Sequence, residues 1–237
     1  APVHAVPSSS ERAMSGAAAR LPIVVLISGT GSNLRVIAER ATDGTLPVEI
    51  RAVVSDRPDA RGLAWAAAQG IPSVALSPRD YPDRAAFDRA LADTVTGFSP
   101  GLVVLAGFMR ILGDEFVDRF AGRLVNIHPS LLPKYRGLHT HRRALEAGER
   151  EHGASVHFVT RELDGGPVVI QARVPIRNDD DEASLAARVL AEEHRIYPEC
   201  IGWFAAGRLQ LRDGAVLLDG RMLASPLVRQ AADVDAA

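Results

Sequence analysis

The sequence predicts an α/β fold, a single, mostly parallel, doubly wound sheet with an antiparallel C-terminal extension. Two observations support this prediction. Short apolar runs alternate with stretches of helical periodicity over the first half of the chain, which is the pattern of repeated β-α-β units. The first run, IVVLI at 23–27, is continuously apolar, as expected for a strand covered on both faces. In such a sheet, ligands bind beyond the carboxyl ends of the strands.

Each element can be placed in chain order from these runs and their boundary residues. The runs predict strands at 23–27, 48–54, 73–76, 102–105 and 124–128, and helices at 32–40, 60–69, 83–95 and 114–120. The third helix carries Phe87, Leu91 and Val95 at a spacing of four, which forms one apolar face. The later chain predicts strands at 155–159 and 167–175, a helix at 182–204 interrupted by Pro198, and a hairpin around Asp213-Gly214.

Composition narrows the class of protein. The 237 residues carry a formal net charge of −2, which gives no indication of nucleic-acid or membrane binding. A single cysteine, Cys200, excludes an internal disulfide framework and favours a reducing compartment, the cytoplasm. No apolar run approaches the ~20 residues that span a bilayer. The first 20 residues lack the apolar region of a signal peptide and predict a flexible tail.

The stretch NIHPSLLPKYRG, residues 126–137, places Asn126 and His128 at the end of a predicted strand. Residues two apart in a strand point to the same face, so these two side chains would project together. An amide and an imidazole can stabilise a developing negative oxygen and move a proton. Such a pair taken alone is more often structural, so the rest of the chain has to decide between the two interpretations.

The stretch SGTGSN, residues 28–33, follows the first strand and opens a helix. Backbone N–H groups at such a helix start form an anion site that suits a phosphate monoester. A dinucleotide loop would need Gly or Ala where Leu34 stands, although Asp56 after the second strand could hold a ribose. No Gly-Lys-Ser/Thr follows, so a Walker loop is excluded. The remaining alternative is a helix cap with a tight turn.

Asp164 and two further histidines are also candidates for a functional role. Asp164 precedes Gly-Gly-Pro; a carboxylate there could lie beside His128 and favour the imidazolium, or it could simply form a turn. His139 and His141 could suggest zinc together with His128, but no nearby Cys or carboxylate has ligand spacing. The sequence therefore predicts no metal and a solvated loop for His139 and His141.

Taken in order, the motifs VVLISGTGSN, VVLAGFMRIL, NIHPSLLPKY, HGASVHFVT and ELDGGPV resemble the folate-dependent formyltransferase family. The resemblance runs from about Leu21 to Leu223 and implies a Rossmann-like formyltransferase domain at 21–223, with tails at 1–20 and 224–237. Thr30 stands where close relatives often carry Asn, and Arg136 where Pro is frequent. Neither position performs chemistry.

The resemblance implies an enzyme that moves the formyl group of the co-substrate 10-formyltetrahydrofolate to the amine of glycinamide ribonucleotide in purine biosynthesis, without a metal. Asn126 and His128 would stabilise the oxyanion, and Asp164 would hold His128 charged and relay protons. The ribonucleotide would be bound by Gly31, Ser32, Asn33, Leu190 and Glu193. The folate would be bound by Arg84, Met109, Arg110, Ile111, Leu112, Asn126, Thr160, Arg161, Glu162, Leu163 and Asp164.

Three alternative functions share some of these features. A methionyl-tRNA formyltransferase would need a basic C-terminal domain, and about 30 residues that are not strongly basic follow the last predicted helix. A formyltetrahydrofolate hydrolase usually carries an additional N-terminal regulatory domain. A non-catalytic nucleotide-binding module would use residues 28–33 and leave Asn126, His128 and Asp164 without a purpose. The sequence leaves open whether the protein is a monomer or a homodimer.

Overall fold

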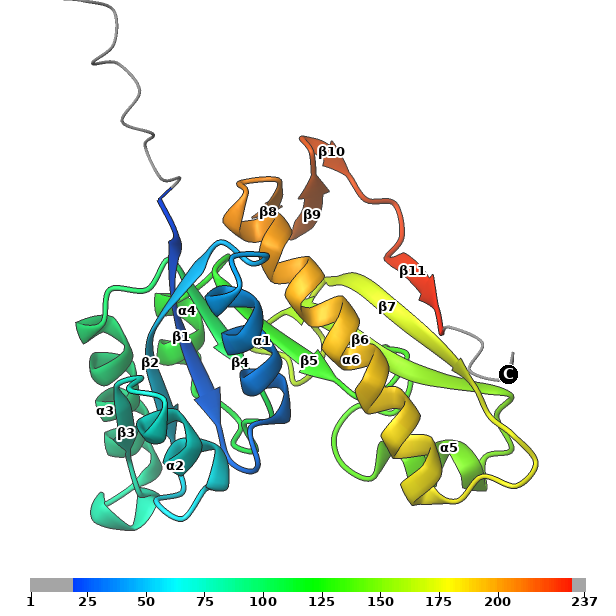
Figure 1. Cartoon of the computed structure of the whole chain (residues 1–237), viewed down its shortest axis with the longest axis horizontal. Helices are drawn as coiled ribbons and strands as arrows, with labels where there is room; N and C mark the ends of the chain where they lie inside the picture. The colour runs from blue at the N-terminus through cyan, green and yellow to red at the C-terminus, as the bar shows by residue number, and fades with distance from the viewer. Residues whose placement is uncertain (1–18, 232–237) are drawn as a thin grey trace, which may run out of the picture.

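The computed structural model describes residues 19–231, which form an eight-stranded sheet with helices on both faces (Figure 1). In spatial order the strands run β11-β7-β6-β5-β4-β1-β2-β3. They are β1 (Leu21–Ile27), β2 (Val48–Ser55), β3 (Ser73–Ala75), β4 (Leu102–Leu105), β5 (Leu124–His128), β6 (Glu151–Phe158), β7 (Val168–Pro175) and β11 (Leu227–Gln230). The sheet is parallel apart from β6, which pairs antiparallel with both β5 and β7.

Six α-helices and a second, smaller sheet complete the described chain. The helices are α1 (Ser32–Thr42), α2 (Arg61–Ala68), α3 (Arg84–Gly97), α4 (Asp114–Arg119), α5 (Thr140–Glu146) and α6 (Glu182–Ala205), with a 3₁₀ turn, η1 (Pro78–Asp80). The small antiparallel sheet contains β8 (Leu209–Arg212), β9 (Ala215–Leu218) and β10 (Arg221–Met222). These elements confirm the predicted α/β class, the mostly parallel sheet and the antiparallel extension.

Two hydrophobic clusters lie on opposite faces of the sheet, and β1 contributes to both. Ile23, Val25 and Ile27 pack with α1, α2 and α6 on one face, whereas Val24 and Leu26 pack with α3 and α4 on the other. All five side chains are fully buried. Alternate residues of a strand point to opposite faces, which explains why this run is continuously apolar.

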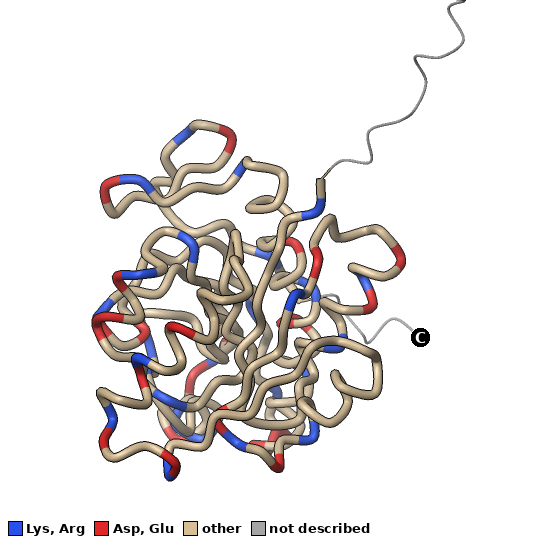
Figure 2. The backbone as a smooth tube through the Cα atoms, turned by 90° about the vertical axis from the view of Figure 1, so that its left-hand side faces the viewer, with Lys and Arg blue, Asp and Glu red and all other residues tan. Residues whose placement is uncertain are grey.

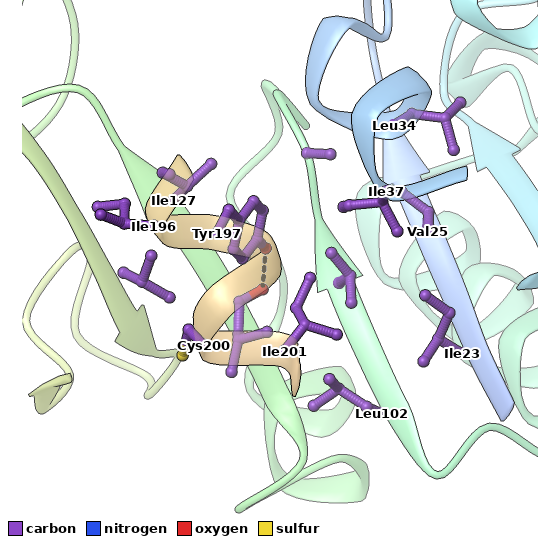
Figure 3. Close-up of a cluster of buried hydrophobic side chains, with 14 of the residues drawn as sticks. Ile23, Val25, Leu34, Ile37, Leu102, Ile127, Ile196, Tyr197, Cys200 and Ile201 are labelled. Atoms are coloured by element: carbon purple, nitrogen blue, oxygen red, sulfur yellow. Dashed lines mark hydrogen bonds between the residues drawn. The ribbon is translucent and has the colours of Figure 1, made fainter. Parts of the chain in front are cut away.

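Helix α6 packs along the first of these faces, where Tyr197 is completely buried (Figure 3). Its hydroxyl shares its one hydrogen between the carbonyl oxygens of Leu105, at 2.7 Å, and Val125, at 3.2 Å. One side chain thus joins α6 to the end of β4 and to β5 near its start. Because a buried hydroxyl without an acceptor is costly, these bonds fix how α6 sits on the sheet.

Three expectations about the fold were wrong. Helix α6 is continuous through Pro198, because Tyr197, Pro198 itself and Cys200 are buried in the core and packing outweighs the missing N–H. Helix α5 occupies part of a predicted loop; its seven residues are too few for the sequence to show a clear apolar stripe. In the predicted tail at 224–237, residues 227–230 form β11, which pairs parallel with β7 while Leu227 packs on the core.

Residues 1–18 and 232–237, which include most of the predicted tails, lie outside the described chain. No helix within residues 19–231 is both long and apolar enough to cross a membrane. Basic and acidic residues are intermixed along the backbone, as Figure 2 shows, so the charge distribution matches the near-neutral composition.

We expect Tyr197→Phe to lower the free energy of unfolding by about 1–2 kcal/mol, because it removes a buried hydroxyl that bonds two strands. Urea denaturation of parent and variant measures the difference. Tyr81→Phe is the matched control, since Tyr81 is only half-buried and its ring contact with Phe87 is kept. Equal stability of the two variants would show that the Tyr197 bonds contribute nothing net.

Candidate active site

Asn126 lies near the carboxyl end of β5, where the register pairs it with His157 of β6. The Nδ2 atom of Asn126 lies 3.2 Å from Nε2 of His157, and Nδ1 of His157 lies 2.9 Å from the carbonyl oxygen of Phe158. A carbonyl can only accept, so Nδ1 carries the proton. Burial lowers the pKa of His157, which keeps the ring neutral. Nε2 therefore accepts one amide N–H of Asn126 and leaves the other N–H for a ligand.

His128 ends β5, and its two ring nitrogens face different acceptors. Nε2 lies 2.9 Å from the carbonyl oxygen of Tyr135, and Nδ1 lies 3.5 Å from Oδ2 of Asp164. The side chains of His128 and Asp164 are each 8% exposed. The structure thus brings together the three side chains predicted to be catalytic. It also adds a constraint, because Nε2–H is already donated within the protein and Nδ1 is the nitrogen that faces the site.

Asp164 is held in an uncommon conformation. Its φ is 48°, in the left-handed region, which a residue other than glycine adopts at a cost of about 1 kcal/mol or more. Its Oδ2 accepts the backbone N–H of Gly137 at 2.9 Å, and its Oδ1 lies 3.8 Å from Nε2 of His157. The carboxylate therefore lies between the two histidines.

A pocket opens beside this group, and nearly all the predicted folate residues line it. From that set, the lining residues are Arg110, Ile111, Leu112, Asn126, Thr160, Arg161, Glu162, Leu163 and Asp164. His157 lines it as well. The two predicted residues outside the lining are adjacent: Arg84 donates to the carbonyl oxygen of Ile111 at 2.8 Å, and Met109 directly precedes the lining segment.

The loop at 28–33 leads into α1, and the N–H groups at the start of that helix have no side-chain cap from residues 19–231. Gly31 has a φ of 73° and stands immediately before Ser32, the first residue of α1. Within the described chain, no side chain caps this helix start and its first turn holds no acidic residue. Uncapped N–H groups and the helix dipole together attract an anion. This start of α1 is therefore compatible with the phosphate site predicted from the sequence.

Gly62, near the start of α2, supports that loop from below. Its N–H donates to the carbonyl oxygen of Gly29 at 3.0 Å. A Cβ placed on Gly62 would lie 2.9 Å from the Cα and 3.0 Å from the backbone nitrogen of Gly31, closer than backbone atoms tolerate. Glycine is thus required at 62 for α2 to approach the loop, a role that the sequence interpretation missed.

Asn33 and Glu193 meet behind the loop, although 160 positions separate them in the chain. Asn33 Nδ2 donates to Glu193 Oε2 at 2.8 Å, and Asn33 Oδ1 is buried without a partner among the described residues. Burial raises the pKa of Glu193 to about 7, opposed in part by the bond from Asn33. Leu190, also predicted to contact the ribonucleotide, lies on the same helix and is 36% exposed.

The remaining polar candidates have structural surroundings. Asp56, considered for a ribose, is buried and accepts the hydroxyl of Ser28 at 2.5 Å. The prediction of a solvated loop was wrong for His141, which lies on α5 with its ring 5.1 Å from that of His152, because α5 turns it inward. Burial lowers the pKa of both rings, that of His152 to about 4. Among the described residues, no three His, Cys, Asp or Glu side chains could hold a metal ion.

Comparison with known proteins agrees with this geometry. The family model described as formyl transferase matches residues 21–201. The chain belongs to the formyl transferase family. The phosphoribosylglycinamide formyltransferase of Escherichia coli is 54% identical over 201 residues, covering 85% of this chain and 95% of that protein. The enzyme of the same name from Haemophilus influenzae is 46% identical over 201 residues, again covering 85% of this chain and 95% of that protein.

Solved structures of the formyl transferase family share the fold. The phosphoribosylglycinamide formyltransferase of Coxiella burnetii superposes with a TM-score of 0.85 at 52% identity, covering 88% of this chain and 99% of that one. The likeness thus extends over almost the whole described chain, and the pocket, the loop at 28–33 and the Asn126–His128–Asp164 group all lie within it.

We expect the free energy of unfolding to fall as pH rises from below 4.5 to above 7, by up to about 3 kcal/mol from Glu193 alone. Between these values the folded protein keeps a proton that the unfolded chain has released. Glu193→Gln is neutral throughout, so it should be more stable than the parent above pH 7 and equally stable below pH 4.5. Denaturation across this range measures the difference, with exposed Glu146→Gln as the control. A parent-to-variant difference that is independent of pH would contradict the burial argument.

Proposed function

We propose that this chain transfers the formyl group of 10-formyltetrahydrofolate to the amine of 5-phosphoribosyl-glycinamide, in purine biosynthesis. The observation that carries the proposal is the convergence of Asn126, His128 and Asp164 beside a pocket that Asn126 and Asp164 line. Relatives named for this activity, at up to 54% identity over most of the chain, support it independently.

Each substrate has a suitable place. The lined pocket beside Asn126 would hold the pterin of the folate, and the exposed guanidinium of Arg84 would meet its acidic tail. The bare helix start at Gly31–Ser32 would hold the 5′-phosphate. Leu190 and Glu193, on α6 behind this helix start, would meet the ribose. The amine would then lie between the two sites.

The residues supply what direct transfer needs. The amine attacks the formyl carbon and forms a tetrahedral intermediate with a negative oxygen. The second N–H of Asn126, left over from its bond to His157, can donate to that oxygen. A protonated Nδ1 of His128 can add a second donor by turning from Asp164, which lies 3.5 Å away. The attacking nitrogen loses one proton and the departing folate nitrogen gains one, and Asp164 can relay both transfers.

The cytoplasm is the compartment that we propose for this reaction. Cys200, the one cysteine of the sequence, is a buried free thiol. Burial raises its pKa well above the ordinary value. A reduced, unreactive thiol fits a reducing compartment.

The deciding experiment is a spectrophotometric assay of folate deformylation with and without glycinamide ribonucleotide. We expect turnover only when the ribonucleotide is present. His128→Ala should lower kcat by about 10²–10⁴-fold, because it removes an acid–base group. His139→Asn is the matched control, since that histidine is exposed and Asn tolerates its φ of 57°. Turnover that ignores the ribonucleotide would instead indicate a hydrolase, and binding without turnover a nucleotide-binding module.

A second expectation concerns the phosphate loop. Gly62→Ala should raise KM for the ribonucleotide by about tenfold, the effect of weakening one hydrogen bond to a charged phosphate, because the added Cβ displaces Gly31. KM for the folate should stay the same. Gly97→Ala is the control, since a Cβ at Gly97 meets nothing within 4 Å. Steady-state kinetics with each substrate varied in turn would refute the assignment of this loop if both KM values moved together.

A further inference from the structure

A row of polar side chains crosses three strands beneath the segment 129–137. The register pairs His128 of β5 with Ser155 of β6, and Ser155 with Gln171 of β7. Directly paired residues project from the same face of a sheet. His128 faces Asp164, but Ser155 and Gln171 are buried behind it, and the reaction described above does not use them.

The Ser155 hydroxyl and the Gln171 side-chain NH₂ group bind the backbone of this segment. The Ser155 hydroxyl donates to the carbonyl oxygen of Ser130 at 2.6 Å and accepts the N–H of Leu132 at 3.0 Å. Gln171 Nε2 donates to the carbonyl oxygen of Leu132 at 2.8 Å and to Ser155 Oγ at 2.9 Å. Since the Leu132 carbonyl can only accept, the orientation of the Gln171 amide is fixed. The two side chains thus hold the segment in place through hydrogen bonds to the backbone of Ser130 and Leu132.

The segment held in this way carries the acceptor for His128. Beyond Leu132, Ser130 Oγ donates to the carbonyl oxygen of Lys134 at 2.6 Å, and the next carbonyl, that of Tyr135, lies 2.9 Å from His128 Nε2. Tyr135 has a φ of 54°, a conformation that a bulky residue keeps only where its surroundings impose it. The position of the Tyr135 carbonyl therefore depends on bonds made earlier in the segment.

We propose that Ser155 and Gln171 are positioning residues of the transfer reaction, which fix the proton of His128 on Nε2 through the carbonyl of Tyr135. The catalytic part of this inference rests on the proposed function, whereas the tautomer of the His128 ring can be measured whether or not the protein transfers a formyl group. With Nε2–H donated to Tyr135, Nδ1 is the nitrogen left to exchange a proton with Asp164 and the substrate. Without the hydrogen bonds from Ser155 and Gln171, the ring proton could move to Nδ1. The unprotonated nitrogen would then be Nε2, which faces the Tyr135 carbonyl and not the site.

The test uses Gln171→Met, which keeps the length of the side chain and removes both donors. We expect kcat for formyl transfer to fall by about 10–100-fold, the effect of misplacing a catalytic group by a fraction of an ångström to one ångström. Both KM values should stay at the parental level, because the folate pocket and the loop at 28–33 are untouched. Gln210→Met is the matched control, since Gln210 lies exposed on the small sheet. Imidazole ¹⁵N spectra at alkaline pH, assigned with His128→Gln, should show His128 protonated on Nε2 in the parent and on a mixture of both nitrogens in Gln171→Met.

Each outcome decides the inference. A parental kcat in Gln171→Met overturns it, and so does a reduced kcat with His128 still protonated on Nε2. If Gln171→Met does not fold, Ser155→Ala is judged by the same two measurements, with Ser155→Thr expected to recover the parental tautomer through its hydroxyl. A parent protein that transfers no formyl group would refute the proposed function, whereas the tautomer measurement would still decide the positioning claim.

Discussion

The candidate site depends above all on the antiparallel register of β5 and β6. That register sets Asn126 opposite His157 and His128 opposite Ser155. A shift by one residue would turn all of these side chains to the other face of the sheet. In an otherwise parallel sheet this pairing is an exception, and it has a consequence for chemistry. Antiparallel partners bring side chains from opposite chain directions into direct contact, so the carboxyl end of β5 gains supporting groups that the preceding β-α units cannot supply.

The overall fold could be predicted from the sequence because its evidence is local. A run such as IVVLI at 23–27 identifies a strand buried on both faces, and apolar residues spaced four apart identify α3. The errors arose where tertiary contacts overrule local preference. Pro198 is accommodated in α6 because this face of the helix, with Tyr197 and Cys200, is buried in the core, and β11 exists because β7 offers an edge on which Leu227 can also reach the core. Neither fact has a signature within a short window of residues.

The candidate site divides in the same way. The residues proposed to touch substrate stand in motifs, and so Asn126, His128 and Asp164 could be named from the sequence together with the loop at 28–33. The groups that hold them could not. His157 matters through a partner 31 positions away, and Gly62 through the space that it leaves beside the loop. These roles are defined by pairs of distant residues, and a single sequence records each member of a pair without recording the pairing.

The two ligand sites are also tied to each other at one point. Strand β1 has β2 on one side and β4 on the other, so the strand order changes direction at β1 and β4. Ser28, directly after β1, joins the connections at this point: its hydroxyl donates to Asp56 and accepts the N–H of Met109, at 2.8 Å. The chain on one side of that bond continues into the loop at 28–33 and on the other into the segment at 109–112. Under the proposed function these two segments hold the phosphate of one substrate and the folate of the other, and the bond ties them together, as a direct reaction between two bound molecules requires.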